Sequence, residues 1–129
     1  MKPNVLVDSC GWIEYFTKGA LADKYEQYIE SADKQTHFTP TIVLYEIYRR
    51  IKSELSEEKA LEACAYIISH TTVVPFGGEL ALEAADVSLK YKLSMADAVI
   101  KSTAERFHAK VVTSDEHLGK LEGVQLIKK

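Results

Sequence analysis

Val5-Leu6-Val7-Asp8 is a short apolar run, rich in β-branched residues, that stops at an acid. This composition predicts a buried strand, and the segment Gly11-Trp12-Ile13-Glu14-Tyr15-Phe16 that follows it predicts a short helix. The chain thus changes from strand to helix directly after Asp8. Short buried strands that alternate with helices are typical of parallel sheets joined by helical crossovers.

The same alternation continues along the rest of the chain. Further strands are predicted at residues 36–39, 72–76, 110–113 and 124–127, and helices at residues 20–32, 40–55, 56–69, 79–91 and 94–107, with one helical turn at 115–120. We expect Thr39 to cap the third helix, with Pro40 in its first turn. The predicted fold is a single α/β domain over residues 1–129, in which a central parallel sheet is covered by helices on both faces, giving three layers.

Composition limits the classes of function that the chain can have. It has 129 residues, of which 47% are hydrophobic, and 19 acidic against 16 basic residues give a net charge of -3. Such a charge does not attract nucleic acid over the whole surface, so any nucleic-acid role requires a local site. Two cysteines are too few for a disulfide framework, and no apolar run is long enough for a signal peptide or a membrane span. We therefore expect a cytoplasmic protein without a membrane partner.

Four acids are expected at one edge of the sheet. Asp8 follows the first strand and Asp115 follows the strand at 110–113, so both lie where ligands bind in parallel sheets, outside the carboxyl ends of the strands. Glu46 lies in the helix after the second strand, and Asp97 lies in the first turn of the helix that Ser94 begins. If both helices begin near that edge, the four carboxylates converge.

Each acid also has a purely structural interpretation. Asp8 and Asp115 are suitable helix N-caps, because Asp is favoured at that position. Asp97 stands at the fourth position of a capping box that begins at Ser94. Glu46 is spaced for surface ion pairs with the arginines three and four residues further along its helix. Spacing alone leaves both interpretations open.

Taken together, the acid-bearing segments resemble those of the PIN-domain ribonucleases, and the length of the chain resembles the VapC-type toxins of toxin–antitoxin pairs. The resemblance extends from residue 5 to residue 127. It rests on four segments: Val5-Leu6-Val7-Asp8-Ser9, Thr39-Pro40-Thr41-Ile42-Val43-Leu44-Tyr45-Glu46, Leu93-Ser94-Met95-Ala96-Asp97-Ala98-Val99-Ile100 and Val111-Val112-Thr113-Ser114-Asp115.

The resemblance implies a metal-dependent endoribonuclease. Its expected site consists of carboxylates that hold Mg²⁺ or Mn²⁺ for the hydrolysis of RNA: Asp8, Glu46, Asp97 and Asp115. Hard divalent cations favour such oxygen ligands. Asp8 and Asp97 are expected to bind the metal directly, and the other two acids to bind a second metal or to act through water. Ser9 and Thr113 are expected to orient a carboxylate, a water or a phosphate oxygen, or else to serve as turn or capping hydroxyls.

The resemblance also implies partners: an RNA substrate, a small antitoxin protein and a second copy of the chain. Large rings are concentrated around the first and third helices, at Trp12, Tyr15, Phe16, Tyr45 and Tyr48. Rings at helical spacing are most often core, but five in two helices leave room for an exposed groove that such a partner would cover. Basic side chains near the acids are expected either to contact RNA phosphates or to form salt bridges; these are Arg49, Arg50, Lys52 and Lys101. His117 is expected to be a surface residue and not a metal ligand.

Two other functions remain as alternatives. A phosphotransfer or phosphatase domain also has an Asp after its first strand, but Asp8-Ser9-Cys10 lacks the second Asp of the phosphatases. Val74-Pro75-Phe76 likewise offers no phospho-acceptor Asp. The other alternative is a PIN-like interaction module without catalytic activity, which the presence of all four acids disfavours.

Overall fold

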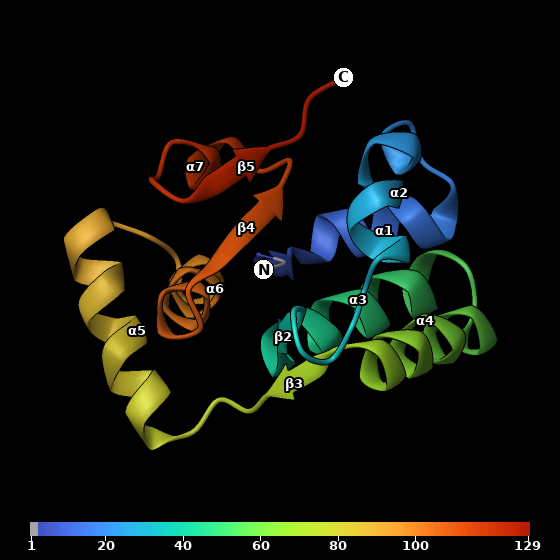
Figure 1. Ribbon diagram of the computed structural model, residues 1–129. Coiled ribbons are helices and arrows are strands. Elements are labelled where there is room, and N and C mark those ends of the chain that lie inside the picture. Colours follow the sequence, from blue (N-terminus) through green and yellow to red (C-terminus); the bar gives the residue numbers. More distant parts are fainter. Residues whose placement is uncertain (1–2) are drawn as a thin grey trace.

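Five strands and seven helices alternate along the chain in the computed structural model, which describes residues 3–129 (Figure 1). The strands are β1 (Asn4–Val7), β2 (Phe38–Pro40), β3 (Thr72–Val74), β4 (Ala109–Thr113) and β5 (Val124–Leu126). The helices are α1 (Ser9–Thr17), α2 (Ala22–Glu30), α3 (Thr41–Glu54), α4 (Glu57–His70), α5 (Gly78–Tyr91), α6 (Met95–Arg106) and α7 (Glu116–Gly119). The predicted order of strands and helices is confirmed.

All strand pairs are parallel, as predicted. One sheet has the order β1-β4-β5, and β2 pairs with β3 in a second sheet. A single parallel bridge between Val5 and His37 joins the two sheets, and the Val5 amide donates a hydrogen bond of 2.7 Å to the Thr36 carbonyl. The spatial order is therefore β3-β2-β1-β4-β5. The register pairs Val7 with Val112, so the residues that follow β1 lie beside the end of β4.

Helices pack on both sides of the strands. Figure 1 shows α5 and α6 on one side and α1, α2, α3 and α4 on the other. The strand residues Leu6, Val7, Val111 and Val112 are buried in the main core, together with apolar side chains of the first four helices. A smaller core between β3, α5 and α6 includes Val74 and Leu80. The three-layer α/β prediction is thereby confirmed.

The start of α3 differs from the prediction. Pro40 is the last residue of β2 and has an extended backbone (ψ 146°), so it occupies the cap position and Thr41 is the first helical residue. Thr39 caps nothing, because its hydroxyl forms a hydrogen bond of 2.8 Å with the Thr71 hydroxyl. Pairing of Pro40 with Val74 in the sheet extends the strand by one residue at the expense of the helix. Ser56 and Ser94, by contrast, cap α4 and α6 through their hydroxyls, as expected.

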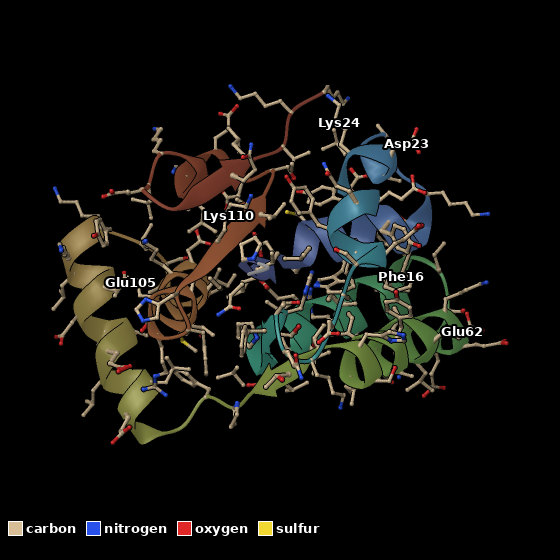
Figure 2. The ribbon with its side chains drawn as sticks, viewed as in Figure 1. Phe16, Asp23, Lys24, Glu62, Glu105 and Lys110 are labelled. Atoms are coloured by element: carbon tan, nitrogen blue, oxygen red, sulfur yellow. The ribbon has the colours of Figure 1, made fainter. Side chains whose placement is uncertain are left out.

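Trp12 also lies elsewhere than predicted. Its side chain is only 1% exposed, and its indole N–H donates to the Val7 carbonyl at 3.1 Å. The Trp12 ring stacks on Phe16, whose ring meets that of Tyr66 in α4 with centroids 5.6 Å apart. Figure 2 shows Phe16 between α1 and α4. Trp12 is therefore core and contributes nothing to a surface groove. Within residues 3–129, we find no helix with the length and apolar character needed to cross a membrane.

Candidate functional site

Asp8 is a buried carboxylate held by hydrogen bonds at the end of β1. It is 5% exposed and caps α1, where its Oδ1 accepts a hydrogen bond of 2.7 Å from the Ser9 amide. Its Oδ2 accepts one of 2.8 Å from the Thr113 hydroxyl. Burial raises the pKa of Asp8, and the Asp115 charge raises it further, against the opposing effect of these two donors. Asp8 is thus both a helix cap and an acid whose ionised form is destabilised by its surroundings.

Thr113 links the two acids that follow the strands. Its side chain is fully buried at the end of β4. The hydroxyl that donates to Asp8 also accepts a hydrogen bond of 3.0 Å from the Asp115 amide. Asp115 caps α7, with its Oδ1 accepting from the His117 amide at 2.8 Å. Thr113 therefore fixes the backbone of Asp115 relative to the Asp8 carboxylate, which suits the supporting role expected for it.

Glu46 in α3 and Asp97 in α6 lie within reach of the charges of the acids at the strand ends. Burial raises the pKa of Glu46, and the charges of Asp8 and Asp97 add to this effect, while the Ser9 hydroxyl lowers it. Burial likewise raises the pKa of Asp97, and the charges of Asp115 and Asp8 raise it further. Each of the four acids therefore either feels the charge of another of the four or acts on one of them, as a shared site at this edge of the sheet would require.

The surface ion pair considered for Glu46 is not formed. Arg50 pairs instead with Glu54 at 2.8 Å, and no ion pair joins Glu46 to Arg49 or Arg50 among residues 3–129. Glu46 Oε1 is buried, and no group in the described part of the chain donates a hydrogen bond to it. A buried carboxylate oxygen without a partner is costly, so this atom calls for a proton, a cation or a bound water.

The donor set fits a hard divalent cation. Carboxylate oxygens are the ligands that Mg²⁺ and Mn²⁺ prefer. A cation would also offset the repulsion between carboxylates, which adds to the effect of burial on the pKa values of Asp8, Glu46 and Asp97. Among residues 3–129 of this structure, no three His, Cys, Asp or Glu side chains lie close enough together to ligate one ion. The fit therefore rests on the chemistry of the donors and on the unpartnered Glu46 oxygen.

Cys10 also belongs to this polar network, although it was not among the residues expected at the site. Its thiol lies 3.7 Å from Asp8 Oδ2, 3.5 Å from Thr113 Oγ1 and 3.6 Å from the buried Tyr25 hydroxyl. Burial raises the pKa of Tyr25, so that its hydroxyl stays neutral. The available signal was position, because Cys10 lies two residues after Asp8, in the first turn of the helix that Asp8 caps.

The basic side chains near the acids are mostly committed to other contacts. Lys101 is nearly buried, donates to the Glu122 carbonyl at 3.0 Å and lies 3.8 Å from Glu105. Lys52 pairs with Glu57 at 3.7 Å. For these two and for Arg50, the salt-bridge alternative is the one observed. His117 is exposed, as expected, but lies close enough for its charge to lower the pKa of Asp97.

The chain is similar to known proteins over most of its length. The family model described as PIN domain matches residues 5–124. Solved structures with the same fold include VapC20 of Mycobacterium tuberculosis, described as a Sarcin-Ricin loop cleaving toxin, with 15% identity, a TM-score of 0.80 and coverage of 97% of this chain and 100% of that one. A toxin-antitoxin complex from Klebsiella pneumoniae is 20% identical, with a TM-score of 0.76 and coverage of 95% and 96%. PAE2754 from Pyrobaculum aerophilum is 21% identical, with a TM-score of 0.71 and coverage of 95% and 88%. No curated protein sequence matches the chain.

Proposed function

Because this chain belongs to the PIN domain family, we propose that it is a Mg²⁺- or Mn²⁺-dependent endoribonuclease and the toxin of a toxin–antitoxin pair. The observation that carries the catalytic part is the unpartnered, buried Glu46 Oε1 among four mutually repelling carboxylates. Surface acids that served only as caps or ion pairs would not need to share a buried edge of the sheet. The toxin part is supported by the fold shared with VapC20 and with the Klebsiella complex.

In this proposal the four acids divide the work. Asp8 and Asp97 bind the metal directly, and Glu46 and Asp115 bind a second ion or act through water. When bound, the metal lowers the pKa of a water molecule and neutralises charge that develops on the phosphate. The Thr113 hydroxyl and the Ser9 amide hold the Asp8 carboxylate in place. Hydrolysis forms a bond between the water oxygen and phosphorus and breaks one P–O bond of the phosphodiester. The ribose oxygen of the broken bond takes a proton and leaves as a hydroxyl.

The test is cleavage of a mixed-sequence, single-stranded RNA by the purified chain, freed of any inhibitor. Cleavage is expected with Mg²⁺ or Mn²⁺ and is expected to stop with excess chelator, because none of the four acids forms an ion pair with a cationic side chain among residues 3–129. Restoring excess metal should restore cleavage. Undiminished cleavage in chelator contradicts the metal mechanism, and no cleavage under any metal condition leaves the non-catalytic interaction module as the better function.

Protein partners are also part of the proposal. An antitoxin is expected to cover the aromatic surface that remains after Trp12 is assigned to the core, where Tyr45 is 62% exposed. A second copy is expected on the apolar side of α5 and the start of α6, where Leu82, Leu89 and Met95 are exposed. With an RNA substrate and an antitoxin as partners, the protein is expected to act in the cytoplasm.

The homodimer is tested by light scattering of the purified chain. Wild type is expected to have the mass of a dimer, and Leu82→Glu with Leu89→Glu is expected to give a monomer, because charges on an apolar interface must be desolvated. A wild-type monomer at concentrations of tens of micromolar contradicts the proposed second copy.

A further inference from the structure

A polar cavity of about 480 Å³ opens beside Asp97. Its walls come from the end of α5, the turn into α6, the first turn of α6, and α7. Asp97 lines it from α6 and His117 from α7, so the cavity adjoins the acidic site. Asp97 is thus the one of the four site acids that lines this cavity.

The cavity is lined by cationic side chains that the rest of the fold does not use. Lys92 and Lys120 are both exposed, and no carboxylate lies within ion-pair distance of either ammonium group among residues 3–129. Lys101 provides the contrast, because it lies one turn beyond Asp97 yet is bound to Glu122 and Glu105. Among the residues that line this cavity, the unpaired lysines are therefore Lys92 and Lys120.

Both lysines stand on backbone that is held in place. Lys92 is the left-handed residue that ends α5 (φ 57°, ψ 49°), with its amide bonded to the Ser88 carbonyl. The Ser88 hydroxyl donates to the Leu93 carbonyl at 2.7 Å and so fixes the turn. Lys120 ends α7, whose Leu118 is fully buried. The two lysines thus extend from ordered backbone, and both line the same cavity.

Two lysines beside the acids favour an anionic ligand that extends from the cavity to the acids. The chain has a net charge of -3, and four carboxylates repel a polyanion at the point where its phosphodiester must be cleaved. Lysines directly beside those carboxylates offset this repulsion and attract an extended phosphate backbone. A strand of RNA meets both requirements, because its next phosphate follows the cleaved one at a short covalent distance.

We infer that Lys92 and Lys120 bind a phosphate of the nucleotide flanking the cleaved bond, with the His117 imidazole as a neighbouring hydrogen-bond donor. The RNA strand then runs from the acidic site across α7 and the turn between α5 and α6. This inference rests on the proposed ribonuclease function. Contacts to phosphate position the strand without reading its sequence, so the effect of these lysines is the same for RNAs of different sequence.

The experiment measures the binding of a labelled, single-stranded RNA of mixed sequence to the full chain in chelator, at several salt concentrations. The double variant Lys92→Gln, Lys120→Gln is expected to reduce the magnitude of the slope of log affinity against log salt by about 0.7, since both lysines act on one phosphate and each neutralised single-strand phosphate contributes roughly 0.7. With Mg²⁺ present, KM for the same RNA is expected to rise roughly ten-fold with kcat little changed, because a contact made equally in substrate and transition state affects binding alone.

The matched control is Lys34→Gln with Lys59→Gln, which removes the same charge from exposed positions before β2 and on α4. This control is expected to change the salt slope and KM only slightly. Equal effects in the two double variants overturn the inference, and so does a fall in kcat with KM unchanged. Failure of the ribonuclease function is distinguishable, because it appears as absent cleavage in wild type, whereas the salt slopes are measured without cleavage.

Discussion

Amide substitution of any one of the four site carboxylates is expected to lower the rate of RNA cleavage by more than about 100-fold, since even groups that only orient metal ligands contribute roughly 10–100-fold. An amide keeps the shape of the side chain but removes the charge that a hard cation requires. The variants are Asp8→Asn, Glu46→Gln, Asp97→Asn and Asp115→Asn. The measurement is the single-turnover cleavage rate with Mg²⁺. The same variants are expected not to slow growth when expressed in cells that wild type arrests.

The control for this series is Asp23→Asn, which removes an exposed acid from the first turn of α2, away from the site (Figure 2). It is expected to cleave RNA at the wild-type rate. Circular dichroism checks that each variant is folded. Cleavage within a few-fold of wild type in two or more of the folded site variants contradicts the assignment of these acids to catalysis.

The second large effect is on the stability of the metal-free protein. Asp97→Asn is expected to raise the metal-free melting temperature by a few degrees, because about 1 kcal/mol of relieved repulsion shifts the midpoint of a domain of this size by roughly 2–6 °C. Asp97 is the clearest position for this test, because the hydroxyl of Ser94 caps α6 in its place. Asp8→Asn is expected to gain less, since Asp8 accepts hydrogen bonds from Ser9 and Thr113.

The same repulsion predicts how metal-free stability depends on pH. The pKa values of Asp8, Glu46 and Asp97 are raised in the folded chain above their ordinary values of 3.8 and 4.5. Between the ordinary and the raised pKa, the folded state binds more protons than the unfolded state, so stability falls as pH rises. Wild type without metal is therefore expected to melt at a higher temperature near pH 5 than near pH 7.5, and this difference is expected to shrink in Asp97→Asn.

Thermal melts at the two pH values, in chelator, measure both effects, with Asp23→Asn again as the control. A lower metal-free melting temperature for Asp97→Asn than for wild type contradicts the repulsion between the acids. So does a difference between the two pH values that is the same in Asp97→Asn as in wild type, since the buried His37, whose pKa is lowered by burial, contributes equally to both proteins.

Local pattern was sufficient to predict most of the architecture. The run that ends at Asp8, the strand at 110–113, and the helix starts at Ser56 and Ser94 depend on neighbouring residues, so the sequence identifies them directly. The acids at the strand ends follow from the same logic, because parallel strands end at a common edge. For Asp8 and Asp115, capping does not exclude a role in the proposed site, since each acid caps a helix and the charge of Asp115 acts on Asp8.

The remaining features depend on contacts between distant parts of the chain. Thr39 meets Thr71 across two strands, Lys101 reaches Glu122, and Cys10 lies beside Thr113, and no local pattern specifies such pairs. The burial of Trp12 likewise depends on packing against α4. The cavity between α5 and α7 joins residues that are more than twenty positions apart, so its lysines could not be grouped from sequence alone.

Calorimetric titration of Mn²⁺ into the metal-free chain detects the proposed cation site without RNA or a partner. Wild type and Asp23→Asn are expected to bind Mn²⁺ with the same saturable affinity, and Asp97→Asn is expected to bind at least about 10-fold more weakly. No saturable binding to wild type, or undiminished binding to Asp97→Asn, would contradict a metal site formed by these four carboxylates.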